Sequence, residues 1–516
     1  MSTGNEQAGR GSARLAERIA IGGLVRGARA VARVAPVRRA IVSSMERRLR
    51  DGASRTGIAR RYPAAVEADR LAMKLAILRV AERALAENLL GDAALRGFIQ
   101  RLVYGVWVKG GDTAAKDRFR AAHGMGPPDF LVLSPGKTCN LQCIGCYASS
   151  GPTREKLPWA TLERIVREAH DLWGSRFFVL SGGETMAYRD DGKGLLDLAE
   201  RFPDCYFLMY TNGTLITDAV ARRMGELGNV MPGLSVEGME ARTDARRGAG
   251  VFRKVLAAME RLRRERVLFG LSLTATRENA EEILSEELVD LFFGKMGALF
   301  AFVFHYMPIG RAFTLDLMMT PEQRVRLWER EWKLVRDERI FIADFWNSGT
   351  ASNGCVAAGR PGGYFYINWD GWMSPCVFMP YAPLNIKDLY ARGGTLDDAW
   401  GDPFFAGLRA WQRDYGYRED GETPAERCGN WLNPCPIRDH HDVFHRLVRA
   451  HHPTPTDPEA AAALADPSYH EGIQRFDREL AALNDPIWES RYRGIANASS
   501  LGDGAAREAA EPIAAD

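Results

Sequence analysis

Six short apolar runs alternate with amphipathic stretches in the middle of the chain, and this alternation limits the fold more than any other feature. The runs, between residues 130 and 306, are FLVLS, RFFVL, YFLMY, PGLSV, VLFGLSLT and LFAFVFHY. Apolar residues share helix faces between them, as in Leu162, Ile165, Val166 and Ala169, or Phe252, Val255, Leu256 and Met259. Such strand-helix repeats predict a parallel sheet buried on both faces, and therefore an open or closed β/α barrel. Its active site is expected at the carboxyl ends of the strands.

The composition is that of an ordinary globular protein. Hydrophobic residues make up 46% of the chain and charged residues 26%, which allows large buried cores. The longest uncharged apolar runs are well short of the ~18 residues that cross a bilayer, and the N-terminus lacks the pattern of a secretory signal. We therefore expect a cytoplasmic protein, in which the eight cysteines are more typical of metal ligands than of disulfides.

Most of the positive charge lies in the N-terminal residues. Through Arg61 the chain has fourteen arginines, no lysine and four acidic residues, whereas the formal net charge of the whole chain is +2. From Leu24 to Ala35, apolar residues and arginines fall on opposite faces, which predicts a basic amphipathic helix that stops near Pro36. Three interpretations stay open: an arginine face packed on the protein itself or solvated, peripheral contact with the inner face of a membrane, or contact with nucleic acid.

Changes in pattern along the chain predict five regions. Two N-terminal helices are expected over residues 64–90 and 93–108, with Pro127 and Pro128 at the following boundary. Later helices are expected over 321–337 and 474–483, and a disordered tail from about Asn497. The regions are a basic amphipathic arm (1–61), a helical N-terminal region (62–127), the barrel (128–312), a linker helix with a cysteine-bearing domain (313–451), and a C-terminal helix with the tail (452–516).

Three cysteines lie close together directly after the first predicted strand, in KTCNLQCIGCYAS. They are Cys139, Cys143 and Cys146. A structural zinc site needs four ligands, and no fourth Cys or His is nearby in the sequence. Three thiolates on a 4Fe-4S cluster leave one iron open for chemistry.

CNLQCIGC has the CxxxCxxC spacing, and here the chain resembles the radical S-adenosylmethionine (radical SAM) superfamily. The resemblance implies a partial (β/α)6 TIM-like barrel whose open iron binds SAM. It further implies reductive cleavage of SAM to methionine and a 5'-deoxyadenosyl radical, which abstracts hydrogen from an unactivated C–H bond. The resemblance also implies an oxygen-sensitive enzyme that receives electrons from a reductant such as flavodoxin or ferredoxin.

Further motifs at successive strand ends extend the resemblance. SGGET matches the family's GGE motif, which contacts the SAM methionyl group, although GGEP is more usual. YTNGT and LSVEG, the latter followed by DARRG, match other SAM-pocket positions. The residues that the resemblance assigns to SAM are Gly182, Gly183, Glu184, Thr211, Asn212, Ser235 and Arg247, with Thr274 and Asn279 as weaker candidates. Gly145 stands where the family commonly has an aromatic residue, so Tyr147 is a candidate to replace that contact.

A second set of cysteines follows the predicted barrel. Cys355, Cys376, Cys428 and Cys435, with Gly371 five residues before Cys376, resemble the C-terminal SPASM/twitch extension of radical SAM enzymes. Two auxiliary clusters would need about seven cysteines, so four imply one auxiliary 4Fe-4S cluster, fully ligated and suited to electron transfer. A structural zinc held by the same thiolates is the alternative.

The remaining candidates are single residues. Cys205 is expected to be an inert core thiol, and His441 and His445 to have structural roles. His305 and Tyr306 end the sixth run, so we expect them to contact substrate at the barrel mouth.

The substrate is the weakest part of the sequence-based assignment. The basic N-terminal helix favours a lipid-like substrate met at a membrane surface, and the alternative is a radical SAM maturase that modifies a peptide or protein. A distant alternative is a zinc-dependent nucleic-acid-binding protein, which leaves the strand-end motifs unexplained.

Overall fold

The computed structural model describes residues 34–55, 62–311, 313–419 and 427–494. Most of the predicted basic helix and the predicted C-terminal tail lie outside these residues. Within them, no helix combines the length and the apolar character needed to cross a bilayer.

A ten-stranded sheet forms the centre of the described part of the chain. Its order is β11-β9-β8-β1-β2-β3-β4-β5-β6-β7. Strands β8 and β1 to β7 run parallel to one another, whereas β9 and β11 add an antiparallel edge next to β8. The strands are β1 (Phe130–Leu133), β2 (Phe177–Leu180), β3 (Tyr206–Thr211), β4 (Val230–Val236), β5 (Gly270–Ala275), β6 (Ala301–His305), β7 (Ile342–Asp344), β8 (Tyr364–Ile367), β9 (Trp372–Ser374) and β11 (Leu384–Asn385).

The six predicted strands are confirmed, and two further parallel strands flank them. β7 pairs with β6, and β8 pairs with β1, both beyond residue 312. The ring of Phe345, directly after β7, contacts Tyr364 of β8 at 6.3 Å between centroids. The two outer parallel strands therefore approach each other, and the cysteine-bearing region supplies part of the same barrel.

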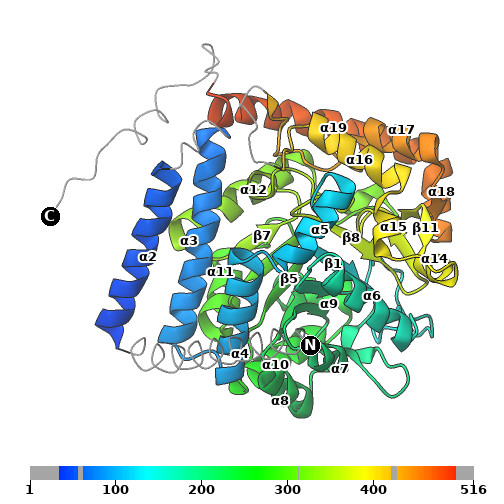
Figure 1. Cartoon of the computed structure of the whole chain (residues 1–516). Coiled ribbons are helices and arrows are strands. Elements are labelled where there is room, and N and C mark those ends of the chain that lie inside the picture. The colour runs from blue at the N-terminus through cyan, green and yellow to red at the C-terminus, as the bar shows by residue number, and fades with distance from the viewer. Residues whose placement is uncertain (1–33, 56–61, 312, 420–426, 495–516) are drawn as a thin grey trace, which may run out of the picture.

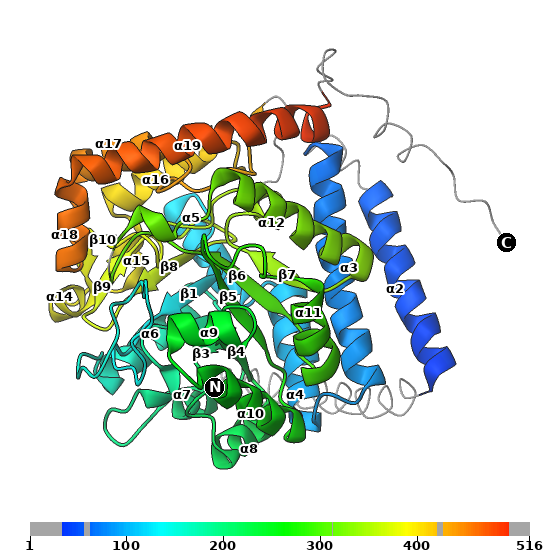
Figure 2. The same cartoon turned by 180° about the vertical axis from the view of Figure 1, so that it is seen from behind.

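Helices surround the barrel as the alternation predicts (Figures 1 and 2). Their apolar stripes face the strands: Leu162, Ile165, Val166 and Ala169 of α6 are all buried. The helices of this part are α6 (Trp159–Asp171), η3 (Thr185–Ala187), α7 (Leu195–Arg201), α8 (Asp218–Leu227), α9 (Glu240–Arg247), α10 (Val251–Arg264), α11 (Glu286–Val289) and η4 (Asp290–Met296).

The region before β1 is helical throughout its described residues. Figure 1 shows α2 lying alongside α3 at the edge of the molecule. The helices are α2 (Ala35–Arg55), α3 (Ala64–Ala86), α4 (Asp92–Arg96), the π-helix η2 (Gly97–Val108) and α5 (Thr113–His123). Pro36 lies in the first turn of α2, where proline is tolerated, and a helix starts there. Phe98 and Leu102 of η2 pack with Tyr206 and Leu208 of β3, which fills the amino-terminal end of the barrel.

The C-terminal part packs along one side of the barrel, with α17 and α19 across its outer edge (Figure 1). A small sheet pairs β10 (Tyr381–Ala382) with β12 (Thr454–Pro455). The helices are η5 (Leu315–Leu317), α12 (Pro321–Lys333), η6 (Leu334–Glu338), α13 (Gly349–Ser352), α14 (Ile386–Ala391), α15 (Leu396–Trp400), α16 (Pro403–Asp414), α17 (His441–His451), α18 (Pro458–Ala465), α19 (Pro467–Ile487) and η8 (Trp488–Tyr492).

Candidate active site

Cys139, Cys143 and Cys146 line one cavity at the carboxyl ends of the strands. The cavity has a volume of about 170 Å³. Ser134 extends β1 by donating its backbone N–H to the Ile367 carbonyl of β8 at 2.9 Å. The loop that carries the cysteines follows directly. The position matches the one that the sequence predicts.

The loop after β2 packs directly onto the cysteine loop. Gly183 and Glu184 donate their backbone N–H groups to the carbonyls of Gly136 and Thr138, both at 2.9 Å. A Cβ atom at Gly183 would lie 2.1 Å from the Thr138 carbonyl oxygen. Glycine is therefore required here because two backbone segments touch, a reason that the motif alone does not reveal.

Glu184 links two other predicted residues, Thr211 and Asn212. Its Oε1 accepts a hydrogen bond from the Thr211 hydroxyl at 2.6 Å, and its Oε2 accepts one from the backbone N–H of Asn212 at 2.8 Å. The Asn212 amide in turn donates to Asn140 Oδ1 in the cysteine loop at 2.9 Å. Burial raises the pKa of the Glu184 carboxyl, and the hydrogen bond from Thr211 opposes that shift. The strand ends of β2 and β3 thus hold one another and the cysteine loop.

Arg247 lies in the cavity wall, where it shares the carboxylate of Glu237 with Arg246. Neither Glu237 nor Arg246 was predicted from the sequence. Arg247 Nε and Arg246 Nη1 both donate to Glu237 Oε1, at 2.7 and 2.6 Å. Glu237 Oε2 is buried without a hydrogen-bond partner. The signals in the sequence were the acid in SVEG and the arginine doublet. Ser235 and Thr274 also line the cavity, whereas Asn279 donates to the carbonyls of Glu237 and Thr274 and so supports the wall from behind.

Arg311, after β6, fastens the cysteine loop from the other side. Its guanidinium donates to the Cys143 carbonyl at 2.9 Å, and its backbone N–H donates to the Cys146 carbonyl at 3.0 Å. Together with the β2 loop and α9, it fixes the backbone from which the three thiols project. This role was not predicted for Arg311.

The space above Gly145 is filled by another aromatic ring. A Cβ atom at Gly145 would lie 2.6 Å from Tyr306 Cε2, so the tyrosine occupies the room that a side chain at 145 would need. Tyr147 takes a different place, where its hydroxyl donates to Ser181 Oγ at 3.2 Å and accepts the Gly182 N–H at 3.0 Å.

His305 lines the cavity, but both of its ring nitrogens are engaged by the protein. Nε2 lies 2.8 Å from Asp344 Oδ2, and Nδ1 lies 3.0 Å from a guanidinium nitrogen of Arg438. The ring stacks on Trp346 with 4.8 Å between centroids. Burial lowers the pKa of His305 to about 4. The arrangement suits a neutral ring that orders the wall.

The three thiols do not lie as close together as the sulfurs of a zinc tetrahedron. Zn–S bonds of about 2.3 Å place the sulfurs of a zinc tetrahedron roughly 3.8 Å apart. Among the described residues, the one Cys/His/Asp/Glu group whose ligand atoms all lie within 4.8 Å of one another is His170, Asp204 and Cys205. Neither cysteine set is that compact, and the cavity lining holds three cysteines without a fourth.

Three of the four later cysteines approach one another. Burial raises the pKa of the Cys376 and Cys435 thiols to about 12, and the nearby Cys355 contributes a smaller rise to each. The hairpin of β8 and β9 carries Gly371 at φ +89° before Cys376, as its turn requires. Cys428 is buried close to Tyr62, and Trp431, three residues after it, packs on Gly354 next to Cys355.

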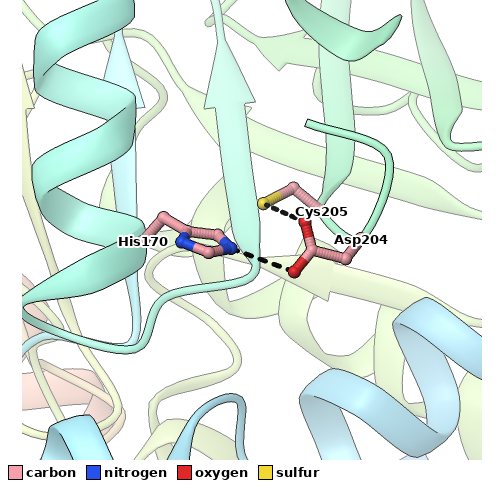
Figure 3. A group of neighbouring side chains, drawn as sticks. All are labelled: His170, Asp204 and Cys205. Atoms are coloured by element: carbon pink, nitrogen blue, oxygen red, sulfur yellow. Dashed lines mark hydrogen bonds and ion pairs between the residues drawn. The ribbon is translucent and has the colours of Figure 1, made fainter. Parts of the chain in front are cut away.

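The compact group of His170, Asp204 and Cys205 is an ion-pair cluster rather than a metal site (Figure 3). His170 Nε2 lies 2.9 Å from Asp204 Oδ2, and its Nδ1 lies 2.6 Å from Asp171. The hydrogen bond with Asp204 raises the pKa of His170, which favours an imidazolium that cannot bind metal. Burial raises the pKa of the Cys205 thiol, which suits the inert thiol that the sequence predicts.

His441 and His445 lie on α17, outside the cavity. His441 Nδ1 donates to the Ile437 carbonyl at 2.7 Å, and its Nε2 faces His470 Nδ1 at 2.8 Å. The ring of His445 lies 4.3 Å from that of His470. These contacts join α17 to α19 and fit a structural role.

Comparison with known proteins places the middle of the chain in a family. Residues 133–285 match the radical SAM superfamily. The AdoMet-dependent heme synthase of Methanosarcina barkeri is 26% identical over 292 residues, which cover 51% of this chain and 80% of that protein. The mycofactocin maturase MftC of Mycolicibacterium smegmatis is 28% identical over 288 residues, 53% of this chain and 69% of MftC. The crystal structure of Streptococcus suis SuiB bound to precursor peptide SuiA has a TM-score of 0.47, at 20% identity over 58% of this chain and 71% of SuiB.

Proposed function

Because the chain belongs to the radical SAM superfamily, we propose that it is a radical SAM maturase that modifies a peptide or protein. When bound, a 4Fe-4S cluster would supply the electron for reductive cleavage of SAM, which would lead to hydrogen abstraction from an unactivated C–H bond of the substrate. The peptide substrate is favoured over a lipid by the likeness to MftC, which extends over 69% of that maturase. This likeness is the observation on which the peptide proposal depends.

Separate sets of cavity residues are proposed to bind the cluster and SAM. Cys139, Cys143 and Cys146 would hold the cluster, with Arg311 fixing the backbone between them. Glu184 would receive the ammonium group of SAM, since its carboxylate is already oriented by Thr211 and Asn212. The remaining SAM contacts are proposed for Gly182, Gly183, Ser235 and Arg247, which line the same cavity.

The test is substrate-stimulated SAM cleavage. Anaerobically reconstituted protein with SAM and reductant is given either the peptide fraction or the lipid extract of the cells that encode it. We expect the peptide fraction to raise 5'-deoxyadenosine formation several-fold, and prior digestion with protease to remove the effect. Stimulation by the lipid extract alone would overturn the peptide proposal.

An auxiliary 4Fe-4S cluster is proposed for Cys355, Cys376, Cys428 and Cys435. The β8–β9 hairpin that leads to Cys376, and the packing of Trp431, three residues after Cys428, on Gly354 next to Cys355, support it. With both clusters, iron analysis should give about eight irons per chain, whereas about four with one zinc would favour the structural zinc. A flavodoxin- or ferredoxin-type reductant is proposed as the electron donor.

A second candidate, a lipid-like substrate met at a membrane, is favoured by one surface of α2. Val34, Val37, Ile41 and Met45 form an apolar stripe at helical spacing and are exposed by 51, 37, 44 and 48%. The exposed Arg39, Arg47 and Arg48 would match an anionic lipid surface.

Vesicle flotation tests this surface. Ile41→Ser with Val37→Ser should weaken binding to anionic vesicles at least fivefold, while Ala40→Ser, also exposed on α2, should leave it unchanged. Equal flotation of all three proteins would remove the membrane proposal.

A further inference from the structure

One half of the active-site cavity is lined by aromatic rings. We call this surface the aromatic wall; it consists of Tyr147, Tyr210, Phe304, Phe345 and Phe378. Four of these rings are half-buried although strands and helices surround them. Because they line the cavity, their exposed surface faces into it.

The aromatic wall is continuous and supported. Phe304 contacts Phe345 at 4.9 Å and Tyr210 at 5.3 Å between ring centroids. Phe378 joins this group through Phe304 and reaches Tyr147, both at 6.0 Å. The rings come from five separate segments, and those of β3 and β6 lie on strands of the central sheet, so the surface is shaped before any substrate arrives.

Charge is confined to the opposite half of the cavity. The charged side chains among the lining residues are Glu184, Arg246 and Arg247. All three are engaged by other protein groups near the cysteine loop. The wall side adds Val132, Val179 and Val377, with Ser272 and Thr274 of β5 as polar neighbours. No acid, lysine or arginine among the described lining residues is available there to pair with a charged substrate group.

We infer that the substrate group which enters this cavity is an uncharged hydrocarbon group, such as a leucine, isoleucine, valine or phenylalanine side chain. Burying a charge against aromatic rings without a partner is strongly unfavourable. Burying a large aliphatic side chain there is favourable by an amount that corresponds to roughly tenfold or more in affinity. The inference depends on the proposed peptide function only for the rest of the substrate, since an alkyl chain of a lipid has the same chemistry.

Binding of small probes to SAM-loaded, reconstituted protein tests the inference. The probes are the N-acetyl methylamides of leucine, lysine and glutamate, together with N-methyloctanamide as an alkyl chain without an amino acid. Apparent Kd values come from the concentration dependence of thermal stabilisation. We expect the leucine probe to bind at least about tenfold more tightly than the lysine and glutamate probes.

Two half-buried phenylalanines, Phe345 in the cavity lining and Phe130 outside it, provide matched variants. Phe345→Ser should weaken the leucine probe at least fivefold. Phe130→Ser removes an equally half-buried ring, which stacks on Tyr364 at the amino end of the barrel, and should change binding less than twofold. Phe378→Leu replaces Phe345→Ser if that variant does not fold.

Deuterium transfer gives a second readout. With a side-chain-deuterated leucine probe, one C–D bond breaks, the deuterium atom joins the 5' carbon of the deoxyadenosyl radical, and the probe carbon keeps the unpaired electron. SAM and one electron from the reductant supply that radical. Deuterated 5'-deoxyadenosine should form from the leucine probe and not from the deuterated lysine probe.

The outcomes separate this inference from the proposed function. Binding of N-methyloctanamide without the leucine probe supports the apolar pocket and removes the peptide function. Tight binding of the lysine or glutamate probe overturns the pocket inference and leaves the peptide function standing. Binding of no probe, or equal loss in Phe345→Ser and Phe130→Ser, also overturns the inference.

Discussion

The residues that form one half of the cavity can be recognised in the sequence, whereas those that form the other half cannot. The polar half comes from the cysteine loop, the ends of β2 to β4, and α9, and its residues stand in short contiguous motifs. The aromatic wall takes single residues from β3, β6, the segment after β7 and the segment after Cys376, together with Tyr147 at the end of the cysteine loop. A cofactor needs fixed groups at fixed spacing, whereas an apolar pocket needs only volume and the right surface. The chemistry of this protein is therefore readable from its sequence, and its substrate is not.

The largest effect is expected when a cluster ligand is removed from the polar half of the cavity. Cys143→Ala removes one of three cluster ligands, so we expect substrate-free 5'-deoxyadenosine formation to fall by about a thousandfold or more. Iron content should fall by about four per chain. Probe binding at the aromatic wall should survive if the two halves are independent. A variant that retains full iron and SAM cleavage would contradict the assignment of this loop.

The second effect tests how the polar half is held together. In Gly183→Ala the new Cβ atom would lie 2.1 Å from the Thr138 carbonyl and 2.6 Å from that of Lys137. Because both obstacles are backbone, the loops must separate, at a cost of about 3 kcal/mol. Chemical denaturation measures this loss. Gly294→Ala is the control, since its Cβ would meet nothing within 4 Å; equal stability of the two variants would show that the loops do not touch.

Sequence reasoning succeeded where function depends on local order. The six strands, the α6 and α10 faces and the cysteine loop follow from periodicity and spacing. Glu237 and Arg311 escaped notice because a single charged residue is identified as a support only once the fold shows what it contacts. β7 and β8 were missed as barrel strands for the same reason, since their pairing joins segments far apart in the chain.

The third effect concerns the junction of the two halves, where His305 is buried. Burial lowers its pKa to about 4 in the folded protein, against about 6.5 when unfolded. The unfolded chain therefore binds a proton that the folded chain excludes, and stability falls as pH drops from about 6.5 toward 4. By pH 5 the loss from this group is about 2 kcal/mol.

His305→Gln keeps hydrogen-bonding groups toward Asp344 and Arg438 but does not titrate. Comparison of wild type and variant by denaturation at pH 7 and pH 5 should show a loss on acidification that is about 2 kcal/mol smaller in the variant. The comparison is needed because burial also lowers the pKa of His441 to about 4, which adds a slope of the same sign. Identical slopes would mean that His305 is protonated in the folded protein, and that it belongs functionally to the charged half.

The smallest effect is expected when the aromatic wall is changed without adding polarity. Phe345→Leu removes one ring but keeps an apolar surface, so stability should fall by only about 1 kcal/mol. Iron content and substrate-free SAM cleavage should stay within twofold of wild type, because the Phe345 ring packs against the rings of Phe304, Trp346 and Tyr364. The change should appear in which apolar probe binds best, with bulkier side chains gaining relative to leucine in the enlarged pocket.

Phe345→Asp is the matched counterpart at the same position. An unpaired carboxylate beside Phe304 should abolish binding of apolar probes, while the hydrogen bonds of Glu184 to Thr211 and Asn212 and of Arg247 to Glu237 keep SAM binding intact. If Phe345→Leu lowered SAM cleavage as strongly as Gly183→Ala, the two halves would act as one unit, since a loss of volume on one side would then disturb the charged groups on the other. Unequal responses would mean that this barrel can exchange one apolar substrate group for another without rebuilding its cofactor site.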